Sequence, residues 1–246
     1  MAGEISVSEK TFGQRREKGV QLSVLCQSLS VFDPVEDLIK LSTYDPFLED
    51  ILNKNKSVED ALMPYKNLIQ QRFDLYYSEK GLIARGRMAR DYLASLPEGK
   101  KSVYFIKVQK EVQKLVDYKN RYKPKITGLP PSGVDKKKNS TSEKGFGSMI
   151  KNGWDILVTL KEVASYNPNN ELIKTDKFEI CLVDIEKKNR AVEEAYIPWD
   201  KLVAERFEMY EGKEGLRVRM SKIKSYIAGE YGKQSNEYIE AVKIKY

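Results

Sequence analysis

Apolar side chains recur at intervals of three or four residues along most of the chain, a spacing that predicts α-helices. The segments 18–32 and 152–166 are the first to show it in each half of the sequence. Pro34 and Pro168 follow shortly after them. Proline lacks a backbone N–H and clashes with the preceding turn, so it cannot extend a helix. A first helix is therefore predicted in each half, ending just before the proline.

A longer apolar stripe follows in the second half. It keeps its phase through Phe178, Leu182, Ile185, Asn189, Val192, Tyr196, Trp199, Val203, Arg206 and Tyr210. An unbroken stripe predicts one face packed along one partner. Pro198 lies inside it, and Pro64 occupies the matching place in the first half. Two structures fit: one long helix kinked at the proline, or a second helix that begins there. The constant phase favours the kinked helix.

Glycine-containing turns at 78–81 and 212–215 are expected to end the long helices, because glycine readily closes a helix. Helical spacing returns over 82–96 and 216–231. A short final helix is predicted after Ser102 or Ser235 in the two halves. These elements together predict an all-α protein.

The two halves repeat one another. NKSVEDALMPYKNLIQQRF (55–73) and NRAVEEAYIPWDKLVAERF (189–207) share eight of nineteen letters, and at an offset of 134 residues 28 of 100 aligned positions are identical without a gap. A fixed-period match of this kind predicts an internal duplication. We expect two homologous helical bundles packed pseudo-symmetrically. They are repeat 1 (1–110) and repeat 2 (145–246), joined by a basic linker region (111–144) rich in Pro, Gly, Ser and Lys.

The composition argues against most catalytic chemistry. The chain has no histidine, the commonest general base and metal ligand. Its two cysteines, Cys26 and Cys181, stand in unlike contexts, which is typical of buried structural thiols. We therefore expect no enzyme, no cofactor and no metal site. The N-terminal sequence lacks the apolar core of a signal peptide, and no apolar run approaches the length of a membrane span, so a cytoplasmic location is expected.

The net charge of +7 raises the alternative of nucleic-acid or polyanion binding. The linker region carries most of it, with 9 Lys+Arg against 4 Asp+Glu, so the repeats are nearly neutral. Basic residues also recur in the two matching helices 82–96 and 216–231. The candidate phosphate contacts are Arg85, Arg87, Arg90, Lys136, Lys137, Lys138, Arg217, Arg219, Lys222 and Lys224. A solvated basic face is the simpler interpretation, and we favour it.

A polar group recurs beside the apolar stripe in both repeats. Arg72 and Arg206 fall on or next to it, and a buried arginine needs a partner because an unpaired buried charge is very costly. We expect a structural polar network within each repeat, with an anion pocket as the alternative. Its candidate members are Asp50, Asn55, Glu59, Arg72, Asp184, Asn189, Glu193 and Arg206.

Repeat 2 also matches a pattern that we know from a family. The matching positions are Asn189, Val192, Ala195, Arg206, Met209-Tyr210, Gly215-Leu216, Gly232, Ser235, Tyr238, Val242 and Lys243. The chain resembles tandem helical repeat proteins of Bacteroidetes-type bacteria. Pro64 and Pro198 depart from that pattern. The resemblance implies a helical tandem fold and no known activity, so it implies no catalytic residue.

These observations favour a non-enzymatic structural or interaction protein. We expect a helical scaffold that associates with itself, as an oligomer or filament, or with another protein, because matching surfaces can propagate head-to-tail contacts. Polyanion binding is the alternative. A deep pocket holding two or more carboxylates in both repeats would instead indicate an enzyme. The sequence leaves open whether the two repeats bind each other or separate ligands.

Overall fold

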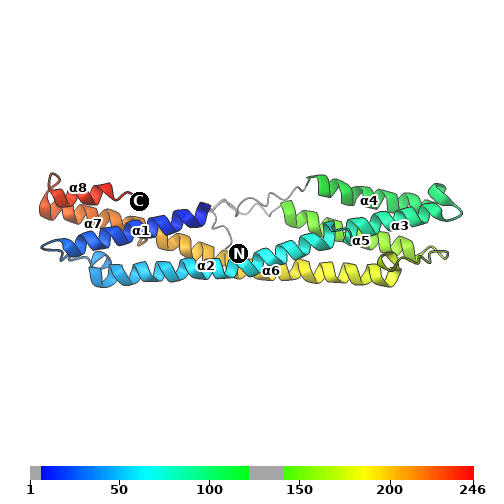
Figure 1. The fold of residues 1–246 in the computed structure, drawn as a ribbon, viewed down its shortest axis with the longest axis horizontal. Helices are drawn as coiled ribbons and strands as arrows, with labels where there is room; N and C mark the ends of the chain where they lie inside the picture. The colour runs from blue at the N-terminus through cyan, green and yellow to red at the C-terminus, as the bar shows by residue number, and fades with distance from the viewer. Residues whose placement is uncertain (1–6, 122–140) are drawn as a thin grey trace. The chain divides into compact units, whose positions relative to one another are not determined.

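The computed structural model describes residues 7–121 and 141–246, and every regular element in these ranges is helical (Figure 1). The all-α prediction is confirmed. The helices are α1 (Val7–Ser28), α2 (Leu41–Tyr77), α3 (Leu82–Ser95), α4 (Val103–Arg121), α5 (Thr141–Lys161), α6 (Thr175–Glu211), α7 (Leu216–Tyr231) and α8 (Asn236–Lys243). Short 3-10 turns lie at η1 (Asp37–Ile39), η2 (Gly99–Lys101) and η3 (Glu171–Ile173).

The two long helices run through their prolines. α2 and α6 have 37 residues each, and Pro64 and Pro198 lie inside them, so the prediction of one continuous helix is confirmed, while the kink at the proline stays a prediction. Both prolines are exposed, as are Asp60 and Glu194, four residues before them. Water can therefore bond the carbonyl that each proline leaves without its helical N–H donor. The cost of the proline is lower on this face than it would be in the core.

The first helices end earlier than predicted. α1 ends at Ser28 and α5 at Lys161, several residues before Pro34 and Pro168. After α1, side chains of α7 satisfy backbone groups that lie outside the helix. The backbone N–H of Val31 donates to the Tyr231 hydroxyl at 3.0 Å, and that of Asp33 donates to the Tyr226 hydroxyl at 3.1 Å. The α7 tyrosines thus replace the bonds that a longer α1 would make.

The predicted final helix and linker also need correction. α4 has 19 residues, so it is not short, and it extends to Arg121. α5 begins at Thr141. The linker region predicted over 111–144 is therefore helical at both of its ends, because helix periodicity continues into its polar composition. Lys136, Lys137 and Lys138 lie outside the described residues.

The described residues form two compact units, and neither coincides with one sequence repeat. Unit 1 contains 7–63 and 197–246, and unit 2 contains 64–121 and 141–196. The division falls inside α2 and α6, so each long helix contributes one end to each unit. Every unit is consequently built from parts of both repeats. The element bounds follow the sequence offset closely, since α6 and η3 begin and end 134 residues after α2 and η1.

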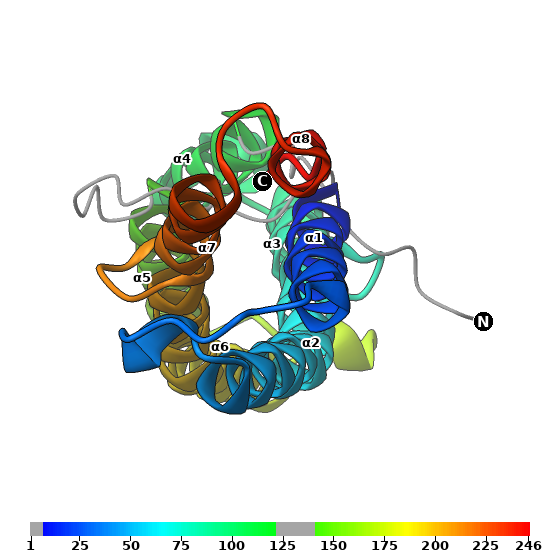
Figure 2. The same ribbon diagram turned by 90° about the vertical axis from the view of Figure 1, so that its left-hand side faces the viewer.

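Unit 1 is built around a core between α1, α2, α6 and α7. Figure 2 looks along this unit and shows these helices around a common interior, with α8 beside α1 and α7. Gly19 allows the close packing, because a Cβ there would lie 2.8 Å from Leu48 Cδ2 of α2 and 2.9 Å from Leu216 Cδ1 of α7. The fully buried core residues include Leu22, Tyr44, Ile51, Tyr210, Leu216, Ile223 and Ile227.

Unit 2 has the matching arrangement. Its core lies between α3, α4, α5 and the adjoining ends of α2 and α6. Gly153 of α5 allows a similar approach, because a Cβ there would lie 2.6 Å from Leu182 Cδ2 and 3.1 Å from Leu82 Cδ1. The fully buried residues include Tyr76, Leu82, Leu115, Ile156, Phe178, Leu182 and Ile185.

Candidate functional site

A buried polar cluster joins α1, α2 and α6 in unit 1. Asn55 Nδ2 of α2 donates a hydrogen bond to the Tyr210 hydroxyl of α6 at 2.9 Å. That hydroxyl in turn donates to the backbone oxygen of Phe12 in α1 at 2.8 Å. The Phe12 ring packs against the Tyr210 ring, with 4.8 Å between centroids. The Arg206 guanidinium lies over the Phe12 ring, 4.3 Å from its centroid, and the residue is only 2% exposed.

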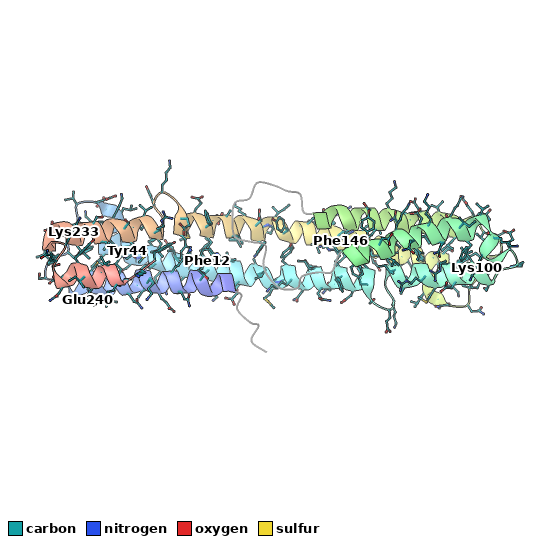
Figure 3. All side chains as sticks on the ribbon, turned by 90° about the horizontal axis from the view of Figure 1, so that it is seen from above. Phe12, Tyr44, Lys100, Phe146, Lys233 and Glu240 are labelled. Carbon is teal, nitrogen blue, oxygen red and sulfur yellow. The ribbon has the colours of Figure 1, made fainter. Side chains whose placement is uncertain are left out.

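Unit 2 has the same cluster made from the equivalent residues. Asn189 Nδ2 donates to the Tyr76 hydroxyl at 3.0 Å, and that hydroxyl donates to the Phe146 oxygen at 3.1 Å. The rings of Tyr76 and Phe146 lie 4.9 Å apart. The Arg72 guanidinium lies 4.1 Å from the Phe146 centroid. Phe12 and Phe146 lie among the helices of their respective units (Figure 3).

Each cluster combines the two repeats. Asn55 and Phe12 come from repeat 1, whereas their partners Tyr210 and Arg206 come from repeat 2, and the cluster in unit 2 reverses this assignment. These contacts differ from the expectation of one polar network within each repeat. The structure instead brings Asn55 together with Arg206 and Asn189 together with Arg72. The ends of α2 and α6 are thus exchanged reciprocally between the repeats.

The four acidic candidates lie elsewhere. Asp50, Glu59, Asp184 and Glu193 are all exposed. The clusters instead use aromatic rings, tyrosine hydroxyls and backbone oxygens, which the sequence analysis did not assign to them. One signal could have found these residues: the pairs Phe12/Phe146 and Tyr76/Tyr210 are identical at the offset of 134.

Burial keeps the cluster tyrosines protonated. It raises the pKa of Tyr76 and of Tyr210 above the ordinary value, and the hydrogen bonds from Asn189 and Asn55 only partly oppose that effect. A protonated hydroxyl can accept from the asparagine and donate to the phenylalanine oxygen at the same time. The two clusters are therefore suited to holding helices in register.

Arg85 of α3 and Arg219 of α7 form a second matched pair, and each binds backbone oxygens of a neighbouring loop. Arg219 of α7 donates from Nε to the Glu214 oxygen at 2.8 Å and from NH1 to the Leu38 oxygen beside η1 at 2.9 Å. Its guanidinium lies 3.9 Å from the centroid of the Phe47 ring. These contacts fix the loop at η1 to the start of α7.

Arg85 of α3 makes the equivalent contacts in unit 2. It donates from Nε to the Lys80 oxygen at 2.8 Å and from NH1 to the Leu172 oxygen beside η3 at 2.6 Å. NH1 also reaches the Lys177 oxygen at 3.3 Å. The position equivalent to Phe47 is occupied here by Cys181. The ring that lies against Arg219 therefore has no equivalent side chain in unit 2.

Most of the other basic candidates have partners within their own unit. Arg90 pairs with Asp91 at 2.6 Å, Arg217 with Glu211 at 3.3 Å, and Lys222 with Glu36. Lys224 donates to the Ile244 oxygen at 2.5 Å, and burial lowers its pKa. Arg87 is exposed. The basic residues of α3 and α7 thus serve mainly contacts inside the units rather than one cationic surface.

Unit 2 contains a pocket of about 570 Å³ beside Arg85. Its wall includes Leu75, Leu172, Ile180 and Cys181, and carboxylates of Asp74 and Asp184 lie at exposed positions on its lining. Cys181 is free and 7% exposed, and burial raises its pKa, which disfavours the reactive thiolate. Cys26 of unit 1 is likewise free and buried, and burial raises its pKa to about 12. Both thiols behave as small apolar groups.

Among the described residues, no group of three or more His, Cys, Asp or Glu side chains is placed to hold a metal ion. None of the helices in the described part of the chain combines the length and apolarity needed to cross a membrane. Comparison of the chain with protein-family models, with curated proteins and with solved structures found no match. The resemblance to Bacteroidetes-type tandem helical proteins stays a prediction.

Proposed function

We propose that the protein is a non-enzymatic helical scaffold that associates with itself head to tail, through α4 of one copy and α8 of the next. The observation that carries the proposal is an exposed apolar pair on each of these two helices, with lysines around the pair on α4 and two glutamates beside the pair on α8. The engagement of buried Arg, Tyr and Asn side chains in contacts that hold helices together supports a structural role.

The α4 surface is apolar and basic. Val103 is 64% exposed and Ile106 is 57% exposed, and their spacing of three residues places them on one face of the helix. Exposed lysines surround this pair, at positions 100, 101, 107 and 110. Figure 3 shows Lys100 on the outside of unit 2. A partner for this surface needs apolar side chains and negative charge.

The α8 surface has these properties. Ile239 is 43% exposed and Val242 is 44% exposed, again three residues apart. Glu237 and Glu240 lie beside them on the same helix, and Glu240, which pairs with Lys243 of α8 at 2.5 Å, is on the outside of unit 1 (Figure 3). An α4-to-α8 contact would bury both apolar pairs and bring lysines near glutamates.

Such a contact is heterologous, because two different surfaces meet. After one contact each copy still has one unused surface, so association continues until a ring closes or a filament grows. We infer that helices α4 and α8 descend from one ancestral helix by tandem duplication, although their apolar pairs are not equivalent, since Val103 and Ile106 align with Glu237 and Glu240 at the offset of 134. The common offset of α2/α6 and η1/η3 and the matched polar clusters support that inference. Two free thiols in the chain fit a reducing compartment, and we propose a cytoplasmic location.

Light scattering after size exclusion, over a wide concentration range, tests the proposal. We expect the mass to rise with concentration, and electron microscopy to show rings or filaments. The variant Val103→Ser/Ile106→Ser lacks the α4 surface, and Ile239→Ser/Val242→Ser lacks the α8 surface, so each alone is expected to stay monomeric. Mixed together they are expected to form a 1:1 dimer that stops, because each variant supplies the surface that the other lacks.

Val35→Ser is the matched control. Val35 is 96% exposed and lies outside the helices, so its replacement is expected to leave association unchanged. A wild-type protein that stays monomeric at every concentration would overturn the proposal. Association that persists in both surface variants would also overturn the assignment of the α4 and α8 surfaces.

A further inference from the structure

Positions 47 and 181 are equivalent in the two units, but their side chains differ in size. Each lies six residues after the start of its long helix, at Phe47 in α2 and at Cys181 in α6. Each faces an arginine that donates to the backbone oxygen beside the preceding 3-10 turn, Arg219 to Leu38 and Arg85 to Leu172. The helix position and the arginine contacts therefore match in the two units. The units differ here in the side chain at this one position.

In unit 1 an aromatic ring fills this place. The Phe47 ring lies 3.9 Å from the Arg219 guanidinium, a distance at which the face of the ring attracts the cation. In unit 2 the thiol of Cys181 is much smaller than a phenyl ring. The pocket of about 570 Å³ opens there, and both Arg85 and Cys181 line it.

We propose that this pocket of unit 2 binds a small monocyclic aromatic compound, whose ring stacks on Arg85 as the Phe47 ring stacks on Arg219. Arg85 is held in place through Nε and NH1, so its guanidinium plane is already oriented for stacking. Leu75, Leu172 and Ile180 supply apolar contacts for the ring edge. Cys181 takes part as a small wall residue, not as a nucleophile.

The ligand class is inferred from the contact between the Phe47 ring and Arg219 in unit 1. A flat ring with a π-face satisfies both the cation and the apolar wall, whereas a saturated ring of similar size satisfies only the wall. Binding is therefore expected to favour p-cresol over 4-methylcyclohexanol by about fivefold, the preference that a cation–π contact at a partly exposed site supplies.

Titration of the full-length protein with p-cresol, followed by NMR of the protein and by calorimetry, tests the inference. Wild type is expected to bind one equivalent, with shifts at Arg85 and Cys181. Cys181→Phe is expected to abolish saturable binding because the new ring fills the pocket. Cys181→Leu fills it partly and is expected to weaken binding, while Cys181→Ala keeps the space and is expected to retain it.

Phe47→Cys supplies the converse test. It removes the internal ring from Arg219, so this variant is expected to bind two equivalents, the second in unit 1. Circular dichroism confirms that each variant keeps its helix content before its binding is interpreted. Absence of saturable p-cresol binding by wild type would overturn the inference. Equal binding by wild type and a folded Cys181→Phe protein, or equal affinity for p-cresol and 4-methylcyclohexanol, would overturn it as well.

Discussion

Asn55 and Tyr210 are hydrogen-bonded across 155 positions of the chain, with 2.9 Å between Nδ2 and the hydroxyl oxygen. The equivalent bond between Asn189 and Tyr76 has the same residues in exchanged roles, at 3.0 Å. Each unit therefore depends on one asparagine from one repeat and one tyrosine from the other. The polar clusters therefore link residues of the two repeats, as the apolar cores of both units also do.

Removal of the tyrosine hydroxyl is expected to destabilise the protein. Tyr210→Phe leaves the Asn55 amide and the Phe12 oxygen without the hydroxyl that links them, and a buried polar group without a partner costs about 1–3 kcal/mol. Tyr76→Phe is expected to have a similar effect through Asn189 and Phe146. Urea unfolding followed by circular dichroism measures the change.

Tyr104→Phe is the control for this prediction. Tyr104 is partly buried, and its ring faces Lys107. Its loss of a hydroxyl is expected to change the free energy of unfolding by less than about 0.5 kcal/mol. Equal urea midpoints for Tyr210→Phe and Tyr104→Phe would show that the cluster contributes no stability.

The close approach at Gly19 provides a second prediction. A methyl group at Gly19 would lie 2.8 Å from Leu48 Cδ2 and 2.9 Å from Leu216 Cδ1, and both leucines are buried in the core. Overpacking of this kind typically costs about 1–3 kcal/mol, more than the roughly 1 kcal/mol that alanine gains over glycine in a helix. Gly19→Ala is therefore expected to lower the free energy of unfolding.

Gly13→Ala is the matched substitution in the same helix. Nothing lies within 4 Å of a Cβ built at Gly13, so the gain in helix propensity is expected to appear unopposed as a stabilisation of about 0.5–1 kcal/mol. The two variants should therefore move the thermal midpoint in opposite directions. A stabilised Gly19→Ala protein would show that the leucines can make room.

Local sequence patterns predict much of the fold, but they predict much less of the polar clusters. The turns near Gly81 and Gly215 place α3, α7 and the ends of α2 and α6 almost to the residue, because backbone chemistry determines where these helices stop, whereas the starts of α2 and α6 were not predicted. The backbone N–H groups of Val31 and Asp33 after α1 donate instead to the hydroxyls of the distant Tyr231 and Tyr226, contacts that no local pattern contains.

The exchange between repeats is equally nonlocal. The two similar halves of the sequence supply Asn55 with two equivalent tyrosines, Tyr76 and Tyr210, and the pattern of residues cannot distinguish them. Asn55 pairs with Tyr210 because the end of α6 that carries Tyr210 belongs to the same compact unit as Asn55, and that assignment depends on tertiary packing. The Phe47/Cys181 difference, in contrast, is visible in the aligned sequences, although its meaning depends on where Arg219 and Arg85 lie.

Alkaline pH is expected to destabilise the protein through Cys26. Burial raises its pKa in the folded state to about 12, from an ordinary value of 9.0. Between these values the unfolded chain loses the thiol proton and the folded chain keeps it. Stability is thus fully present below about pH 9 and falls as the pH rises towards 12, by about 1.4 kcal/mol for each pH unit from this one group.

Cys26→Ala removes that group, so its stability is expected to fall less steeply than that of wild type over the same pH range. Urea unfolding at several pH values between 8 and 11 measures the two slopes. Parallel curves for the two proteins would contradict the contribution of Cys26. The chain has no histidine, so both proteins are expected to show little change between about pH 6 and 8.

Replacement of Pro198 is expected to stabilise α6. The proline lies inside a continuous helix on an exposed face, where alanine would restore a backbone hydrogen bond and is favoured by up to about 3 kcal/mol. Loss of the proline's restriction on the unfolded chain offsets about 0.4–1 kcal/mol of that gain. Pro198→Ala should therefore raise the free energy of unfolding by about 1–2 kcal/mol in urea titrations. Pro97 lies in the exposed turn after α3, so Pro97→Ala removes only the restriction on the unfolded chain. This variant is expected to have a slightly lower free energy of unfolding than wild type. A destabilised Pro198→Ala protein would show that the core of its unit requires a bend at this proline.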